Sequence, residues 1–322
     1  MRLVSFDKGS GQEGLGVVRK GLILNVDECP DAPEWLAEQE RKGRVKAACR
    51  MTRLLALGPD KLKSLDRWAE DFSERFDAPR PPFALAAGQT RLLAPVPWPN
   101  KLLLLAGNYA DHIREFNRES VEKSESTPRV FMKPPTTTII ATGEAIVIPR
   151  NGVKIDYELE LALVMGGHAR FVSPEQAQGL IAGYTVLNDV SERALKIEPG
   201  RKPRDGDKWF DWLNGKWFDT FAAMGPCLVT ADELGDVSRL KMELRVNGEK
   251  RQSATPGHMV FSPAELVSWT SRLMTLEPGD VIATGTPAGV GMATGRLLKA
   301  GDVVEAEIEG IGVLRNPVTA AG

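Results

Sequence analysis

Two carboxylates stand two residues apart in the mostly apolar stretch KIDYELELALVMGG, residues 154–167. The alternation predicts a β-strand, in which successive side chains point to opposite faces. Glu158 and Glu160 would then share one face, where their like charges repel each other. Two interpretations remain open. The face is exposed to solvent, as in a half-exposed antiparallel strand, or the acids bind a divalent cation that turns the repulsion into attraction.

A third carboxylate, Asp189, follows the β-rich apolar run of residues 181–187. Strand ends place side chains on rigid backbone at the rim of a domain, which is a frequent position for functional groups. Three carboxylates with no His or Cys nearby in sequence form a set of hard oxygen ligands, which suits Mg²⁺, Mn²⁺ or Ca²⁺ rather than zinc. An Asn-Asp pair at a strand end is also typical of a turn or a helix cap.

A candidate general base occurs in the segment NYADHIREF, where His112 and Glu115 are three residues apart. On a helical turn the two side chains face the same way, so Glu115 can fix the tautomer of His112 and raise its basicity. The alternative is an ordinary surface pair on a helix, which stabilises the helix by a few tenths of a kcal/mol.

The stretches that must position these residues differ in their hydrophobic period. Residues 1–30 alternate like a small hairpin, and residues 33–76 have the spacing of two amphipathic helices. Three prolines within residues 77–88 then mark a boundary, and from about Gln89 onward the pattern is mostly that of strands. We therefore expect a small α/β domain over residues 1–95 and a mostly β domain over residues 96–322.

The composition favours a protein that acts on small molecules. The chain has 322 residues, 42% hydrophobic content and a formal net charge of −2. Without a basic stripe or an apolar run of roughly 20 residues, we expect no nucleic-acid partner, no membrane span and a cytoplasmic location. The three cysteines are too few and too widely spaced for a disulfide framework or structural zinc. A G-x-G-x-x-G string at Gly9–Gly14 continues into a strand rather than a helix, which argues against dinucleotide binding.

Eight ordered segments resemble the fumarylacetoacetate hydrolase family. They are LAGNYADH, VFMKP, DYELELALVMG, GYTVLNDVSER, GKWFDTF, MGPCLVT, LEPGDVIATGTPAGVG and GDVVEAEIEGIGVLRNPV, and they extend from about Lys101 to Val318. The resemblance implies an α+β, mostly β fold, in which mixed sheets form a roll around the metal site. It also implies a homodimer.

The resemblance implies a role for several residues. Metal ligands would be Glu158, Glu160 and Asp189, usually for Mg²⁺. His112 and Glu115 would activate water on a segment that closes over the substrate, and Lys216 would contact substrate oxygens beside the metal. Substrate-binding positions would be Thr286, Gly285, Arg193 and Lys196. Lys196 replaces a Gln of many family members. The stretch from Lys196 to Lys216 is longer than in compact members, and its Trp209, Phe210 and Trp212 would roof the pocket or line a subunit contact.

The implied reaction is cleavage of a carbon–carbon bond in a β-diketo acid, such as an acylpyruvate from aromatic catabolism, through an enolate that a divalent metal stabilises. Decarboxylation or keto–enol isomerisation of a 2-oxo acid at the same site is the alternative, because the enolate serves these reactions when no water attacks. A non-catalytic metal-binding protein would leave His112, Glu115 and Lys216 without a role.

Overall fold

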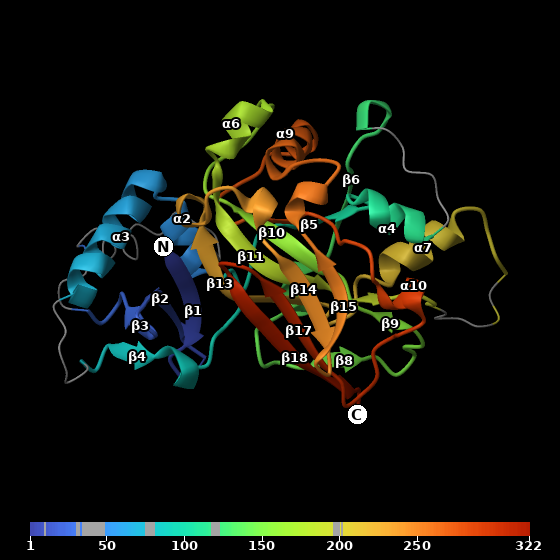
Figure 1. Cartoon of the computed structure of the whole chain (residues 1–322), viewed down its shortest axis with the longest axis horizontal. Helices are drawn as coiled ribbons and strands as arrows, with labels where there is room; N and C mark the ends of the chain where they lie inside the picture. Colours follow the sequence, from blue (N-terminus) through green and yellow to red (C-terminus); the bar gives the residue numbers. More distant parts are fainter. Residues whose placement is uncertain are drawn as a thin grey trace.

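The computed structural model describes residues 1–9, 11–29, 33, 49–74, 81–116, 123–195, 200 and 202–322. The described chain is mostly β and contains a large sheet, a five-stranded sheet and a two-stranded ladder (Figure 1). Short helices lie around the sheets, and this arrangement confirms the expected α+β, mostly β fold with mixed sheets.

The large sheet has eleven strands, with both parallel and antiparallel pairs. They are β1 (Arg2–Asp7), β2 (Glu13–Arg19), β3 (Leu22–Asn25), β4 (Ala84–Ala86), β5 (Leu102–Ala106), β6 (Arg129–Met132), β7 (Ile139–Ile140), β10 (Leu159–Met165), β11 (Ile181–Asp189), β13 (Ala222–Thr230) and β16 (Val281–Ala283). Their order is β4-β3-β2-β1-β13-β11-β10-β16-β5-β6, and β7 pairs with β13 beside this path. The candidate metal ligands therefore lie near the centre of the sheet, on the adjacent strands β10 and β11.

Two smaller sheets complete the β structure. The five-stranded sheet contains β8 (Ile146–Ile148), β14 (Met242–Val246), β15 (Glu249–Ala254), β17 (Val303–Ile308) and β18 (Gly312–Ala320). Its strand order is β15-β14-β17-β18-β8. The two-stranded ladder pairs β9 (Ile155–Asp156) with β12 (Ser191–Glu192), and it brings the residues that flank the candidate ligands together.

The helices are short. The α-helices are α2 (Arg50–Leu55), α3 (Pro59–Glu74), α4 (Ala110–Glu115), α5 (Pro135–Thr138), α6 (Pro174–Gln178), α7 (Asp207–Asn214), α8 (Ala231–Leu234), α9 (Pro263–Leu273) and α10 (Gly291–Thr294). The 3₁₀ turns are η1 (Ala87–Gln89), η2 (Lys123–Glu125), η3 (Val237–Arg239) and η4 (Pro256–His258). No helix in the described ranges is long and apolar enough to span a membrane.

Helix α3 confirms one of the two amphipathic helices expected over residues 33–76. It buries Leu62, Leu65, Ala69 and Phe72 at helical spacing. Most of the stretch expected to form the other helix, residues 34–48, lies outside the described residues. Helix α9 begins with a capping box, in which the Ser262 and Glu265 side chains each accept a hydrogen bond from the backbone N–H of the other residue.

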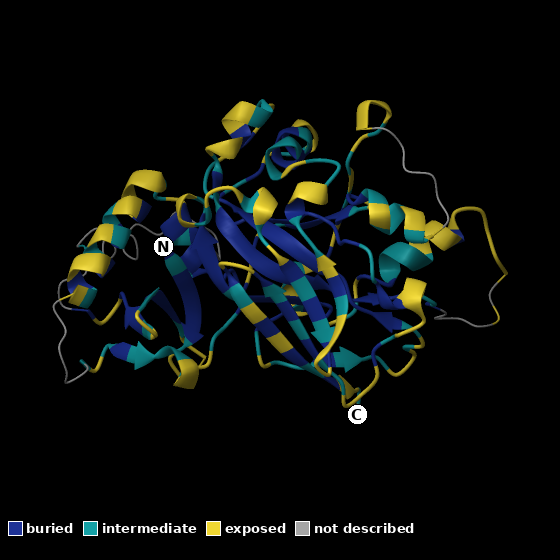
Figure 2. Ribbon diagram, viewed as in Figure 1, coloured by how far each residue is buried: buried dark blue, intermediate teal, exposed yellow. Residues whose placement is uncertain are grey.

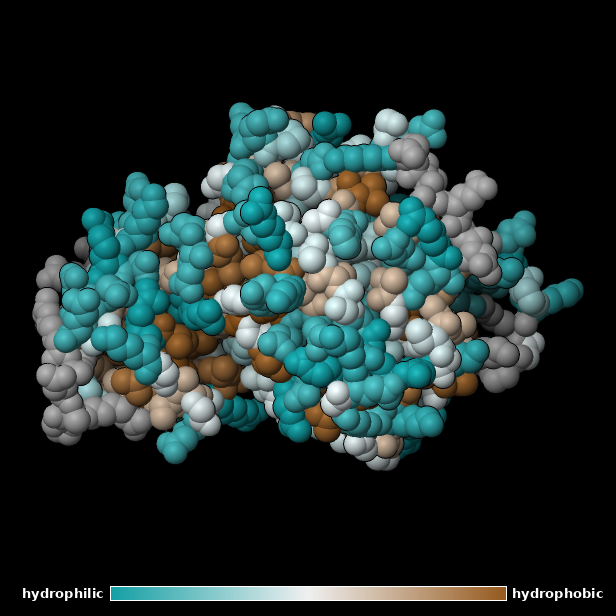
Figure 3. All heavy atoms as spheres, in the orientation of Figure 1, coloured by the Kyte–Doolittle hydropathy of each residue, from teal (hydrophilic) through white to brown (hydrophobic). Residues whose placement is uncertain are grey.

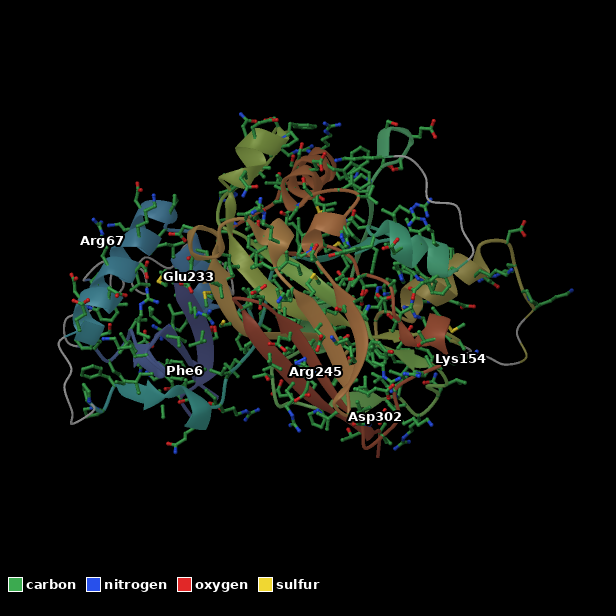
Figure 4. The ribbon with its side chains drawn as sticks, in the orientation of Figure 1. Phe6, Arg67, Lys154, Glu233, Arg245 and Asp302 are labelled. Carbon is green, nitrogen blue, oxygen red and sulfur yellow. The ribbon has the colours of Figure 1, made fainter. Side chains whose placement is uncertain are left out.

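The N-terminal strands are continuous with the large sheet. Strand β1 pairs antiparallel with β13, with Arg2 opposite Val229. The amino group of Met1 lies 2.5 Å from Glu233, which is labelled beside these strands in Figure 4. The proposed division at residue 95 therefore separates two stretches of sequence that share one sheet, and it stays a prediction.

Burial differs between the sheets. Every residue of β10 is buried, whereas β17 alternates between buried and half-buried residues, as a strand with one wet face should (Figure 2). Hydrophilic atoms accordingly cover most of the surface in front of the five-stranded sheet (Figure 3). Leu159, Leu161 and Leu163 of β10 belong to one apolar cluster and Ala162 and Val164 to another, so the large sheet packs apolar layers on both faces.

Candidate active site

The three candidate metal ligands come together at one end of the β10–β11 pair. Glu158 directly precedes β10, Glu160 is its second residue, and Asp189 ends β11. Because the two strands are antiparallel, the end of β11 lies beside the start of β10, and the Asp189 N–H donates to the Glu158 carbonyl at 2.9 Å. One carboxylate oxygen from each residue lies within 4.8 Å of the other two.

These acids do not face solvent. Glu158 is 5% exposed, and Glu160 and Asp189 are each 1% exposed. The interpretation of this face as the wet side of a half-exposed strand is therefore wrong, because all three side chains are buried. Buried carboxylates so close together require compensating charge, since burial and mutual repulsion both disfavour ionisation.

Three cations supply part of this compensation. The Lys216 ammonium lies 2.6 Å from Glu158 Oε2 and 2.5 Å from Asp189 Oδ2. Lys133 Nζ lies 2.5 Å from Asp189 Oδ1, and the Arg193 guanidinium contacts Glu158. None of these three cations contacts Glu160 directly within the described contacts; its Oε2 instead accepts the Gly285 N–H at 2.8 Å.

The carboxyl groups consequently differ in their proton affinity. Burial raises the pKa of Glu158, but Arg193 and Lys216 outweigh burial and leave its pKa well below the usual value. The pKa of Glu160 is raised well above the usual value by burial and by repulsion from Asp189 and Glu158. Of the three carboxylates, Glu160 is therefore the one whose negative charge is least compensated by neighbouring cations.

The donor set fits a divalent cation with hard ligand preferences. All three groups are carboxylates, and neither His nor Cys belongs to the cluster. Asp189 Oδ1 accepts no directed hydrogen bond, although the Lys133 ammonium is close to it. A divalent cation bound among these oxygens would supply the positive charge that the two lysines do not supply to Glu160.

The candidate base is assembled on α4. His112 Nδ1 lies 3.0 Å from Glu115 Oε2, and both side chains are mostly buried. Because an ionised carboxylate can only accept, this contact assigns the proton to Nδ1 and leaves Nε2 as the atom that can take a proton. The Gly289 N–H donates to the other Glu115 oxygen, Oε1, at 2.5 Å. The pair is thus tethered to a distant loop and is no free surface pair.

Backbone N–H groups of residues 285–292, the loop after β16, donate hydrogen bonds to three different carboxylates. Gly285 donates to Glu160 and Gly289 donates to Glu115, as described above. Gly291 donates to Asp156 Oδ1 at 2.6 Å, and Met292 donates to Asp156 Oδ2 at 3.0 Å. One glycine-rich loop therefore connects the metal ligands, the base and the Asp156 carboxylate.

A cavity of about 600 Å³ opens over this site. His112, Glu158 and Lys216 line it together with Thr286 and Arg193. Its outer part is aromatic: the Trp209 and Trp212 rings stack with centroids 4.9 Å apart, and Phe131 meets Trp212 edge-on at 5.0 Å. Trp209 and Trp212 therefore line the cavity, whereas Phe210 does not border it, and a role of this stretch as a roof or as a subunit contact stays a prediction.

The four proposed substrate-binding residues have different surroundings. The Thr286 hydroxyl accepts a hydrogen bond from Gln252 at 2.9 Å and borders the cavity. Arg193 also borders the cavity, but it pairs with both Asp156 and Glu158. Gly285 donates its N–H to Glu160. Lys196 lies outside the described residues, as do residues 117–122 of the polar segment 114–128 that is expected to close over the substrate.

Sequence reasoning missed two groups that hold the site. Lys133 is completely buried, and burial lowers its pKa to about 8. Asp156 is also fully buried, receives two N–H groups of the 285–292 loop and pairs with Arg193 at 2.9 Å. The sequence offers one local indication of the Lys133 contacts: the lysine stands between Met132 and Pro134 at the end of an apolar strand. An ammonium buried there needs hydrogen-bond acceptors or a carboxylate close by.

Residues 101–319 match the family described as fumarylacetoacetate (FAA) hydrolase C-terminal. The chain belongs to this family, which confirms the resemblance of the eight sequence segments. Proteins of this family or fold include hydrolases, isomerases and oxaloacetate tautomerases that act on small organic acids.

The similarity to three known proteins extends over nearly the whole chain. The mitochondrial oxaloacetate tautomerase of Xenopus laevis is 35% identical over 99% of this chain and 90% of its own length. A fumarylacetoacetate hydrolase structure from Exiguobacterium antarcticum is 31% identical, with full coverage of both chains and a TM-score of 0.75. A maleylpyruvate hydrolase from Sphingobium sp. SYK-6, in complex with manganese(II) and pyruvate, is 27% identical with full coverage and a TM-score of 0.73.

Proposed function

We propose that the protein is a divalent-metal-dependent hydrolase that cleaves the carbon–carbon bond between the two oxo groups of an acylpyruvate. The observation that carries this proposal is the His112–Glu115 pair near a buried cluster of three carboxylates, with His112 and Glu158 lining the same cavity. Glu158, Glu160 and Asp189 would hold the cation, with Mg²⁺ as the proposed ion. The manganese and pyruvate bound to the similar maleylpyruvate hydrolase support a metal site that accepts 2-oxo acids.

A bound divalent cation would withdraw electron density from the oxygens of a 2-oxo acid and favour negative charge there. His112 Nε2 would take a proton from water as the water oxygen attacks the distal carbonyl carbon. The bond from that carbon to the methylene group then breaks, and His112 returns the proton to the methylene carbon. The products are pyruvate and the acid of the distal acyl group, which together contain all atoms of the substrate and water.

Lys216 would support this step from the cavity side. Its ammonium has three N–H donors and contacts two oxygens, those of Glu158 and Asp189, in the described part of the chain. The third donor is free to meet a substrate oxygen on which negative charge develops. Thr286 would hold the substrate carboxylate, together with N–H groups of its loop other than the four that donate to protein carboxylates.

The cavity favours a substrate longer than a four-carbon diacid. Its volume of about 600 Å³ lies in the range of sites for drug-sized ligands, and its outer wall is formed by flat aromatic rings. An acylpyruvate with an unsaturated or bulky distal group would fill this part of the cavity.

A second candidate activity is keto–enol tautomerisation of oxaloacetate. The similarity to the frog oxaloacetate tautomerase favours it, because that similarity extends over 99% of this chain. The reaction requires proton transfer between carbon and oxygen but no attack by water. His112 would transfer the proton in this reaction as well, whereas only hydrolysis requires the activated water, and pyruvate release distinguishes the two.

The first test follows fumarylpyruvate by the loss of its enol absorbance, with pyruvate release measured in parallel. We expect release of pyruvate with Mg²⁺, no release with a chelator, and a loss of about 10²-fold or more in His112→Ala. Asp111→Asn, on the same helix but exposed, is the matched control and should retain activity.

The outcomes of this test separate the candidate activities. Loss of absorbance without pyruvate, together with faster equilibration of enol and keto oxaloacetate, would replace the hydrolase by a tautomerase. Metal-dependent loss of CO₂ from oxaloacetate would indicate a decarboxylase. If no metal-dependent turnover of either compound occurs, the proposed function is wrong.

A further inference from the structure

Two lysines contact the two oxygens of Asp189 separately. Lys216 contacts Oδ2 and also lines the cavity, whereas Lys133 contacts Oδ1 and does not border the cavity. The Lys133 side chain has no exposed surface. A substrate in the cavity can therefore meet Lys216, but the contacts of Lys133 are confined to the protein.

Three oxygens surround the Lys133 ammonium: two carbonyl oxygens accept its hydrogen bonds, and Asp189 Oδ1 lies 2.5 Å away as its ion-pair partner. Besides Asp189 Oδ1, these are the carbonyl oxygen of Val190, at 2.9 Å, and the carbonyl oxygen of Phe221. Lys133 follows the end of β6, Val190 follows β11, and Phe221 directly precedes β13. The ammonium thus joins three strand termini at the place where Asp189 leaves the sheet.

Burying an ammonium costs free energy that an apolar side chain of similar volume would not cost. Packing alone therefore does not account for a lysine at this position. Lys216 cannot replace it, because the Lys216 ammonium already bridges Glu158 and Asp189. A function that only Lys133 can supply is to restrain the Asp189 carboxylate from the side away from the cavity.

We propose that Lys133 is a positioning residue for the metal site, which holds the Asp189 carboxylate in the orientation needed beside Glu158 and Glu160. This inference rests on the proposed metal site but not on the reaction. Hydrogen-bonding partners of metal-ligating carboxylates commonly affect metal affinity by 10–100-fold. Lys133 neither touches the substrate nor exchanges a proton with it.

The test is calorimetric titration of the metal-free protein with MnCl₂, so the readout is binding and not turnover. We expect Lys133→Met to weaken Mn²⁺ binding by about tenfold or more. Lys101→Met is the matched control, because Lys101 pairs with Glu277 and Asp280 and does not border the cavity. It removes a lysine that bridges two acids and should leave the Mn²⁺ affinity unchanged.

A second variant separates position from charge. Lys133→Arg keeps the positive charge, but its planar fork cannot match the three oxygens that surround an ammonium. Positioning predicts weaker Mn²⁺ binding in both variants. A purely electrostatic effect predicts tighter binding in Lys133→Met, where a nearby cation is lost, and unchanged binding in Lys133→Arg.

The Lys133→Arg titration decides the proposal if Lys133→Met does not fold, as thermal unfolding would reveal. Unchanged or tighter Mn²⁺ binding by folded Lys133 variants would overturn the proposal. A wild-type protein that binds no Mn²⁺ would remove the metal site and this inference with it. Intact Mn²⁺ binding without turnover of acylpyruvate would instead contradict only the proposed function.

Discussion

The carboxylate cluster and the base above it are held in different ways. Glu160 and Asp189 lie on the adjacent central strands β10 and β11, opposite Leu187 and Ala222 respectively, and Glu158 directly precedes β10. His112 and Glu115 lie on α4, a six-residue helix without a side-chain cap at its N-terminus. The Glu115–Gly289 hydrogen bond adds a tertiary restraint on this pair.

The groups that would bind the cation and the groups that would transfer a proton therefore belong to separate parts of the molecule. Strand pairing makes the cluster part of the core, so its repulsion is stored in a structure that cannot easily relax. The base depends on a short segment over the cavity. We infer that changes in α4 can alter the reaction while the metal site persists, which accords with the different activities of similar proteins.

The largest effect should come from breaking the carboxylate cluster. Glu160→Gln removes the carboxylate whose pKa is raised most by burial and repulsion, and it leaves an oxygen for the Gly285 N–H. We expect Mn²⁺ affinity to fall by about 100-fold or more, and turnover of acylpyruvate by about 10³-fold.

The same substitution should stabilise the metal-free protein by about 1 kcal/mol, because it relieves like-charge repulsion in the core. Thermal unfolding in the presence of chelator measures this effect, with Glu305→Gln, which removes the half-buried partner of Arg315, as the control. A destabilised metal-free Glu160→Gln protein would contradict the repulsion that we describe.

A smaller effect should follow from changing the base alone. In Glu115→Gln the amide can still accept the Gly289 N–H, but it can donate to His112 Nδ1 and so favour the tautomer protonated on Nε2. We expect kcat to fall by about 10²-fold, while KM and Mn²⁺ affinity stay within about twofold. Steady-state kinetics and calorimetry check this split. An equal loss of metal affinity would show that the base and the cluster are one unit.

The smallest effect should come from weakening the hydrogen bond between the Gly289 N–H and Glu115. Gly289 has φ +104°, and a Cβ there would lie 2.2 Å from the Arg251 carbonyl oxygen. Gly289→Ala should displace the N–H that holds Glu115 and lower kcat by about tenfold. Gly295 also has a positive φ, +73°, but nothing lies within 4 Å of its added Cβ.

Gly295→Ala therefore matches the backbone strain of Gly289→Ala without the collision, and kcat should be unchanged. Equal losses of kcat in both variants would show that backbone strain at a positive-φ glycine, and not the Glu115 hydrogen bond, limits turnover. Unfolding of both proteins in urea distinguishes loss of stability from loss of activity.

Local sequence patterns predicted several features of the site. The two-residue period placed Glu158 and Glu160 on one strand face, and the three-residue spacing predicted the His112–Glu115 contact that the structure contains. The family, and with it the fold class, followed from ordered segments. These signals succeed because strand and helix geometry relate residues that are close in sequence.

Other features were decided only by the tertiary structure. The sequence left open whether the glutamate face was wet, and the tertiary packing buries it beside Lys216, Lys133 and Arg193. It did not indicate that Lys133 would approach Asp189, or that Gly289 would approach Glu115 across 174 positions. Such contacts depend on which strands and loops become neighbours. Hydrophobic period specifies the face of each element, but long-range packing selects the charged partners that meet there.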